Sequence, residues 1–168
     1  SSYAPALTNL GSIEVSKGDK QEGLSLLIKA TESAPQLAPA WLNLANGYFQ
    51  LGETQLAEVS IRKSIEINPC LFNSHLLLGS ILVGQKKLQE AEISIRKSIE
   101  LNPSFFQAHL SLGAILRDLD KLEEAEISIR RSIELNPNFF NSHFLLSNIL
   151  FGQNRLQEAE ISIRRSIE

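Results

Sequence analysis

Hydrophobic and polar positions follow a helical period along most of this chain. In residues 88–101, apolar or small side chains stand at Leu88, Ala91, Ile95 and Ile99, which is i, i+3, i+7 and i+11. This spacing places them on one face of a helix, unlike the strict alternation of a half-buried strand. Each unit of the chain contains two such amphipathic segments, so the pattern predicts a succession of helix pairs.

One segment is copied along the chain at a constant spacing. The sequence AEISIRKSIELNP at Ala91–Pro103 recurs with few changes at Ala57–Pro69, Ala125–Pro137 and Ala159–Glu168, a 34-residue period. Such a period is typical of stacked-repeat proteins, in which each unit contacts its neighbours. Because the last unit stops before its Asn-Pro pair and the chain lacks Met, we expect a fragment of a longer repeat protein. We predict a single array over residues 1–168, with repeats 4–37, 38–71, 72–105, 106–139 and a truncated 140–168.

Proline and glycine residues divide each repeat into two predicted helices. Asn-Pro pairs at 68–69, 102–103 and 136–137 are predicted to end the second helices, because proline disfavours helix in the preceding residue. Gly18, Gly52 and Gly84 are predicted to lie at or near the tight turn inside a repeat, where left-handed backbone angles favour glycine. Small residues at two recurring positions predict a close crossing of the two helices. These residues are Gly11, Ala45, Gly79, Gly113 and Ser147, and Gly23, Ala57, Ala91, Ala125 and Ala159.

The second repeat resembles a known family. Its key residues are Trp41, Leu44, Ala45, Tyr48, Gly52, Ala57, Ile61, Ser64 and Pro69. They are similar to the pattern of the tetratricopeptide repeat (TPR), W-x2-L-G-x2-Y, then A-x3-F and a proline. The other repeats keep this register but hold Leu7, His75, His109 or His143 at the Trp41 position. The resemblance implies an all-α, right-handed α-α superhelix, a TPR solenoid of antiparallel helix hairpins.

Composition narrows the function classes. The formal net charge is −3 and no run of Lys or Arg stands out, which disfavours nucleic-acid partners. The apolar runs are far too short to cross a bilayer, so we expect no membrane partner. The single cysteine, Cys70, fits a reducing compartment, and we expect a cytoplasmic protein.

No residue set for catalysis or metal binding stands out. Nucleophile–base sets, phosphate loops and zinc motifs are lacking, so we predict no enzyme activity, no cofactor and no metal. The three histidines replace a packing aromatic residue and lie one repeat apart, roughly 10 Å, too far to share one ion. We therefore predict a packing role for them. Cys70 has no basic neighbour in sequence and is interpreted as an ordinary loop residue.

The two helices of each repeat differ in character. The second helices are near-identical copies, and Glu92, Arg96 and Glu100 are predicted to form an ion-pair ladder on a solvated face. By contrast, residues 38–52 and 72–85 contain no charged residue. The TPR resemblance implies that the first helices line a concave, ligand-facing groove. The candidate groove residues are Asn9, Leu42, Asn43, Asn46, Phe49, Asn73, Leu76, Ser80, Val83, Gln107, Leu110, Arg117, Asn141, Phe144, Asn148 and Phe151, with Thr8, Ser12, Leu77, Ser111 and Leu145 placed on the same surface.

An apolar surface with scattered amides suits an extended peptide, because Asn and Gln pair with backbone groups while Leu and Phe hold side chains. We predict a non-catalytic protein–protein interaction scaffold that binds an extended, largely uncharged segment. TPR domains that clamp a chaperone's terminal carboxylate use Lys and Arg on the groove face, and the corresponding positions here hold Thr8, Ser12, Asn43, Asn73 and Leu77. Asn9 and Asn43 resemble the asparagine ladder of O-GlcNAc transferase, which leaves open a substrate-recruiting arm of a larger enzyme such as a glycosyltransferase. A third alternative is a structural array that self-associates end to end through its uncapped last repeat.

Overall fold

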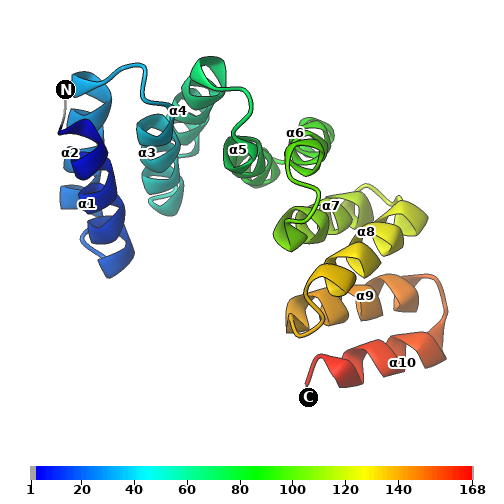
Figure 1. The fold of residues 1–168 in the computed structure, drawn as a ribbon. Helices are drawn as coiled ribbons and strands as arrows, with labels where there is room; N and C mark the ends of the chain where they lie inside the picture. The colour runs from blue at the N-terminus through cyan, green and yellow to red at the C-terminus, as the bar shows by residue number, and fades with distance from the viewer. Residues whose placement is uncertain (1–2, 168) are drawn as a thin grey trace. The chain divides into compact units, whose positions relative to one another are not determined.

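The computed structural model describes residues 3–167 and divides into two compact units, Ser1–Lys86 and Lys87–Glu168 (Figure 1). All regular secondary structure among the described residues is helical. The first unit, unit 1, contains α1 (Ala4–Lys17), α2 (Lys20–Ser33), α3 (Ala38–Gln50), α4 (Thr54–Ile67) and α5 (Phe72–Gly84). The second unit, unit 2, contains α6 (Leu88–Leu101), α7 (Phe106–Asp118), α8 (Leu122–Leu135), α9 (Phe140–Gly152) and α10 (Leu156–Arg165).

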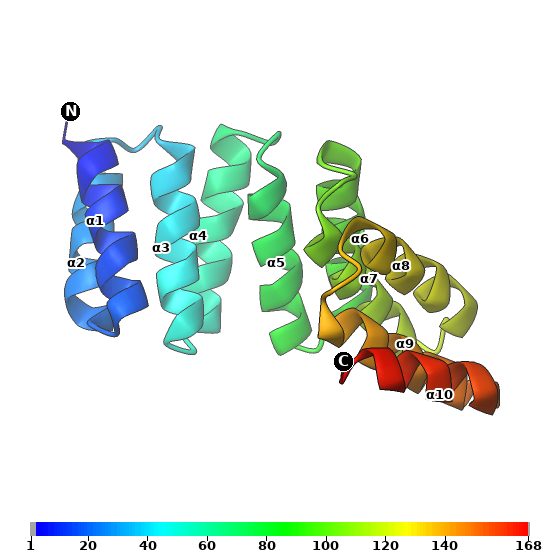
Figure 2. The ribbon, with the colours of Figure 1, turned by 60° about the horizontal axis from the view of Figure 1, so that its bottom comes forward.

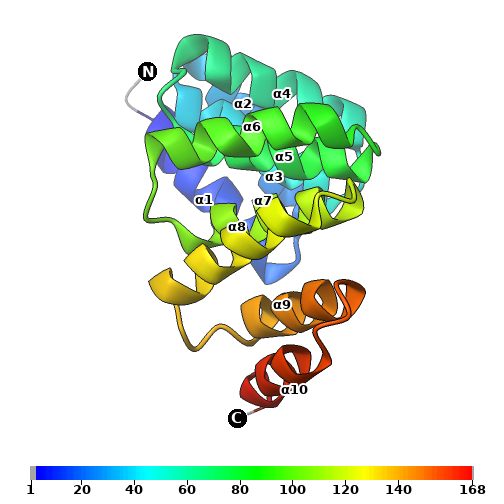
Figure 3. The same cartoon turned by 90° about the vertical axis from the view of Figure 1, so that its right-hand side faces the viewer.

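The helices pack in the order in which they occur. Helices α1 and α2, α3 and α4, α7 and α8, and α9 and α10 contact each other as hairpins. Each first helix also packs on the second helix before it, as α3 does on α2 and α9 on α8. Figure 2 shows this succession for α1 to α5, and Figure 3 shows α9 between α8 and α10. The predicted helix pairs are therefore present in both units.

The second helices end where the Asn-Pro pairs predict. Helices α4, α6 and α8 end at Ile67, Leu101 and Leu135, each immediately before its asparagine. The side chain of Asn68 accepts a hydrogen bond from the backbone N–H of Cys70 at 3.0 Å, which closes the turn after α4. The prediction is confirmed because the proline and the asparagine both favour leaving the helix at this point.

The turn within each repeat follows the sequence only in part. Gly18 and Gly52 adopt left-handed backbone angles, with φ of 104° and 81°, as predicted. Gly84, expected at or near this turn, ends α5, and the left-handed residue of the turn is Lys86, with φ of 61°. Lys86 occupies the repeat position of Gly52, whereas Gly84 lies two residues earlier. The repeat register, more than the residue type, sets the turn.

The small residues lie where the two helices of a hairpin cross. A Cβ added to Gly23 of α2 would lie 2.5 Å from Cγ2 of Val15 and 2.7 Å from the backbone oxygen of Gly11. Both glycines are buried, and Ala57, Ala91 and Ala125 at the Gly23 position are fully buried. The close crossing predicted from these residues is confirmed.

Buried serines join consecutive repeats. The Ser64 hydroxyl donates to the backbone oxygen of Ala38 at 3.0 Å and lies 2.9 Å from the hydroxyl of Ser74. The next-but-one repeat has the same pair, Ser132 and Ser142, at 2.9 Å. Between them, Ser98 has no hydrogen-bond partner in the described part of the chain, and Ala108 stands at the position of Ser74 and Ser142. One of the three serine positions therefore lacks its hydrogen bond.

In each unit the first helices lie closer together than the second helices. The Cα atoms of α1 and α3, of α3 and α5, and of α7 and α9 approach within 8 Å, whereas no two second helices within the described part of one unit do so. The first helices therefore line the inner side of each unit's stack, and the second helices lie on the outer side. This arrangement positions the candidate site.

An outer ion-pair network links neighbouring second helices of unit 2. Glu92 of α6 pairs with Arg96 at 2.9 Å and with Lys121, the residue before α8, at 2.8 Å. Arg96 reaches on to Glu124 of α8 at 2.7 Å. The same links recur between α8 and α10, where Glu126 pairs with Arg130 and Arg155, and Arg130 with Glu158.

Of the predicted ladder Glu92–Arg96–Glu100, only the pair between Glu92 and Arg96 is present. Arg96 turns to the next helix and not to Glu100, which pairs with Lys97 at 2.7 Å. The hydrogen bond from Lys121 lowers the pKa of Glu92, and those from Arg96 add to it against the opposing effect of burial. The surface expected to be merely solvated instead connects adjacent repeats.

Candidate functional site

A shallow depression of about 290 Å³ lies between α3 and α5 on the inner side of unit 1. Helix α3 has Leu44 in the core, and Leu42 and Asn46, one turn apart, share the face that borders the depression. Helix α5 likewise buries Leu78. The residues that line the depression are Leu42, Asn43 and Asn46 of α3 with Asn73, Leu76, Leu77 and Ser80 of α5. All of them were placed on the inner surface from the sequence.

The depression combines apolar side chains with amide groups available for bonding. The side-chain amides of Asn43, Asn46 and Asn73 make no hydrogen bond to another described residue. Leu42 and Leu76 are half-buried, so each keeps part of its side chain at the surface. Amides can donate and accept at once, as the N–H and C=O groups of an extended peptide require. The chemistry is therefore that of a surface for polar backbone and apolar side chains.

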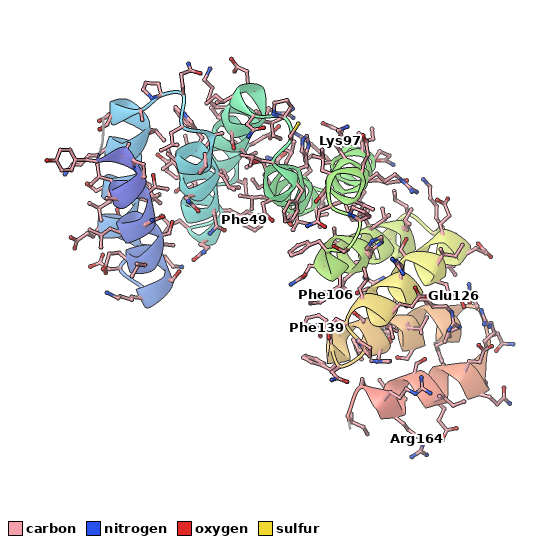
Figure 4. The ribbon with its side chains drawn as sticks, in the orientation of Figure 1. Phe49, Lys97, Phe106, Glu126, Phe139 and Arg164 are labelled. Carbon is pink, nitrogen blue, oxygen red and sulfur yellow. The ribbon has the colours of Figure 1, made fainter. Side chains whose placement is uncertain are left out.

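Other predicted groove residues of unit 1 lie outside the depression. Asn9 of α1 is exposed, and Val83 near the end of α5 is 37% exposed. Phe49 lies on α3 (Figure 4) and is half-buried, and its ring is 4.0 Å from the position of a Cβ built on Gly84. Thr8 is buried instead, and its hydroxyl donates to the backbone oxygen of Ala4 at 2.8 Å. Its placement on the inner surface was wrong.

The remaining candidates belong to unit 2. Gln107, Leu110 and Arg117 of α7 are half-buried, while Asn141, Phe144, Asn148 and Phe151 of α9 are exposed. Arg117 pairs with its neighbour Asp118 at 2.7 Å, so its charge is partly compensated. Leu145, also placed on the inner surface from the sequence, is 7% exposed and belongs to the core.

A family model for the tetratricopeptide repeat matches residues 4–37, 38–69, 72–105 and 106–139. The chain belongs to the tetratricopeptide repeat family. The matched segments correspond to the first four predicted repeats, and the all-α solenoid fold class is confirmed. That residues 1–168 form one array stays a prediction. No curated protein matches the sequence.

Solved TPR structures share this fold at low sequence identity. PilF of Pseudomonas aeruginosa has a TM-score of 0.92 and 21% identity, covering 99% of this chain and 76% of PilF. MamA of Desulfovibrio magneticus RS-1 has a TM-score of 0.88 and 17% identity, covering 99% and 94%. YrrB, described as a TPR protein with an unusual peptide-binding site, has a TM-score of 0.78 and 19% identity, covering 96% and 83%. TPR proteins are generally non-catalytic interaction scaffolds that bind proteins or peptides.

The histidines take over a structural contact of the TPR tryptophan. The ring N–H of Trp41 donates to the backbone oxygen of Pro35 at 2.9 Å. His75, His109 and His143 place Nε2 at 2.9, 2.9 and 2.7 Å from the backbone oxygen of the proline six residues earlier. Because a carbonyl only accepts, Nε2 carries the proton. These hydrogen bonds support a structural role for the histidines, and the constant six-residue spacing from proline is the sequence signal that points to them.

Cys70 is exposed with a free thiol. Among residues 3–167, no group of three or more His, Cys, Asp or Glu side chains is placed to hold a metal ion. No helix in the same range is long and apolar enough to span a membrane.

Proposed function

We propose that this TPR chain is a non-catalytic scaffold that binds an extended, largely uncharged peptide of a partner protein in the depression between α3 and α5. The observation that supports this most is the composition of the two helices. Neither α3 nor α5 contains an Asp, Glu, Lys or Arg, although 21% of the whole chain is charged. A peptide with charged side chains would lose hydration there and find no counter-charge.

The geometry of the depression supports the extended conformation. Its lining runs across two neighbouring helices, with amides on both, so a peptide crossing from α3 to α5 meets bonding groups along its backbone. Leu42, Leu76 and Leu77 offer apolar contact between these amides. YrrB, which has the same fold, is described as having a peptide-binding site. This likeness supports the proposed ligand class.

Selection from a phage-displayed library of unstructured peptides tests the proposal. The enriched sequences should be poor in charged residues, and a selected peptide, synthesised with a fluorophore, should bind in an anisotropy titration. Leu76→Glu places an unpaired charge in the depression and should weaken binding by at least about tenfold, which is about 1.4 kcal/mol. Asn43→Ala, a smaller change, removes one amide and should weaken binding several-fold.

A matched control separates binding from folding. Val59 of α4 is 67% exposed on the outer side of the same unit, so Val59→Glu introduces the same charge away from the depression. Its affinity should equal that of the unchanged protein, with equal helicity in all variants. Enrichment of charged peptides, or equal losses for Leu76→Glu and Val59→Glu, would contradict the proposal.

A further inference from the structure

Three isoleucines are exposed on the outer side of unit 2. Ile93 of α6, Ile127 of α8 and Ile161 of α10 are 71%, 70% and 54% exposed. They occupy the same position in successive repeats, and their neighbours Ile95 and Ile129 already fill the hairpin core at 0% exposure. A β-branched residue is a modest helix former, so neither helix stability nor internal packing explains an isoleucine at this place.

These side chains form one row, called here the isoleucine row. The outer ion-pair network connects α6 to α8 through Arg96 and Glu124, and α8 to α10 through Arg130 and Glu158. The three second helices are therefore linked in succession on the outer side of unit 2, and the isoleucines occupy equivalent repeat positions on them. Single exposed apolar residues are normal, but an exposed isoleucine repeated on three linked helices of one surface is a feature of the kind found at interfaces.

The charges on either side of the row differ in sign on the central helix. On α8, Glu123 stands four residues before Ile127 and Arg131 four residues after it, so all three share one face. On α6 the same places hold Gln89 and Lys97, and on α10 they hold Gln157 and Arg165. One edge of the row is thus acidic or amide-bearing. The other edge carries cations, of which Lys97 and Arg131 also pair with Glu100 and Glu134 on their own helices.

We propose that the isoleucine row is an interface with a second copy of this chain. A two-fold axis along the row makes α8 antiparallel to α8 of the second copy, so that Ile127 meets its own counterpart. Arg131 of each copy then faces Glu123 of the other, and Lys97 faces Gln89. With the axis parallel to α8, Arg131 of one copy would instead face Arg131 of the other copy. Repulsion between the like charges disfavours this orientation. The charge pattern of the surface is therefore complementary to itself in one orientation.

End-to-end stacking of copies has weaker support from the same charges. Within unit 2, Glu92 and Glu126 each pair with a cation in the next repeat, Lys121 or Arg155. The first repeat has Asp19 at that position, so a second copy stacked on α10 would bring Asp19 near Glu160. Two like charges would then replace an ion pair.

Sedimentation velocity over a concentration series tests the proposed interface. The unchanged protein should show a dimer that increases with concentration, and Ile127→Asp should weaken it at least about tenfold. Ile127 is exposed, so the variant should keep its helicity by circular dichroism. Leu76→Glu, in the inner depression, should leave the dimer unchanged, which separates this proposal from the proposed function.

Charge reversal tests the orientation. Glu123→Arg and Arg131→Glu should each weaken the dimer about tenfold, and the double variant should restore it because the pairs form again with reversed sign. A protein that stays monomeric at every concentration would overturn the proposal. So would a dimer that Ile127→Asp leaves intact, or one that the double variant fails to restore.

Discussion

The first and second helices of this TPR chain use their residues for different tasks. In unit 1, α3 and α5 carry no charge and present amides and leucines on the inner side. In unit 2, the outer helices α6 and α8 are near-copies and hold an ion-pair network and buried serines. Each repeat must fit the next, so the residues that join repeats are copied. The residues free of that requirement vary, and recognition is best sought among them.

The crossing of α1 and α2 offers the largest expected effect on stability. Gly23→Ala would bring a methyl group within 2.7 Å of the backbone oxygen of Gly11, and a backbone atom cannot easily move away. We expect a loss of about 2 kcal/mol in the free energy of unfolding, even after the gain of about 1 kcal/mol in helix propensity. Urea unfolding measures it, with Ser25→Ala at an exposed position of α2 as the control. A variant as stable as the control would contradict the crossing geometry.

The buried serines offer a sharper comparison within the second helices. Ser132→Ala leaves the hydroxyl of Ser142 without its partner and should lower stability by about 1 to 2 kcal/mol. Ser98→Ala removes a hydroxyl that has no partner and should be neutral or stabilising. Thermal unfolding of the two variants under the same conditions measures the difference. Equal losses would show that Ser98 is as well bonded as Ser132.

The outer ion-pair network gives the smallest expected effect and a dependence on pH. Burial raises the pKa of Glu126, but the hydrogen bonds from Arg130 and Arg155 lower it by more than burial raises it. The resulting pKa therefore lies below the ordinary 4.5. A lowered carboxyl pKa stabilises the fold above the unfolded-state pKa, and this is lost as pH falls through the folded-state value. Glu126→Gln should therefore lower stability by about 1 kcal/mol at neutral pH and by less below about pH 4.

Urea midpoints at the two pH values check this dependence. Glu100→Gln is the control, because the pair of Glu100 with Lys97 lies within one exposed turn of α6 and does not connect α6 to another helix. If Glu126→Gln lost as much stability in acid as at neutral pH, the ion pairs would not be the cause. None of these outer or crossing variants should change peptide affinity.

Local rules of the sequence predicted much of the fold. The ends of α4, α6 and α8 follow from Asn-Pro, whose effect is confined to adjacent residues. The seven residues of the depression followed from the TPR register, which fixes the face of each helix. Lys86 was missed because its left-handed backbone is imposed by the repeat and not by its own preference.

Contacts between helices were beyond the sequence pattern. A spacing of four residues predicts the ion pair between Glu92 and Arg96, but it gives no information on the contact of Arg96 with Glu124 of the next helix. Leu145 and Thr8 are buried, and a small rotation of the helix decides whether such a position faces the core or the inner surface. Such rotations depend on the packing of neighbouring side chains, which one helix alone does not determine.

The side-chain amide resonances of the asparagines and glutamines test the central account most directly. On titration of a selected peptide, NMR spectra should show shifts for Asn43, Asn46 and Asn73 of the depression. The amides of Gln55 on α4 and Gln89 on α6, both exposed on second helices, should remain in place. Shifts at Gln55 and Gln89, with the three asparagines unchanged, would contradict recognition by the first helices.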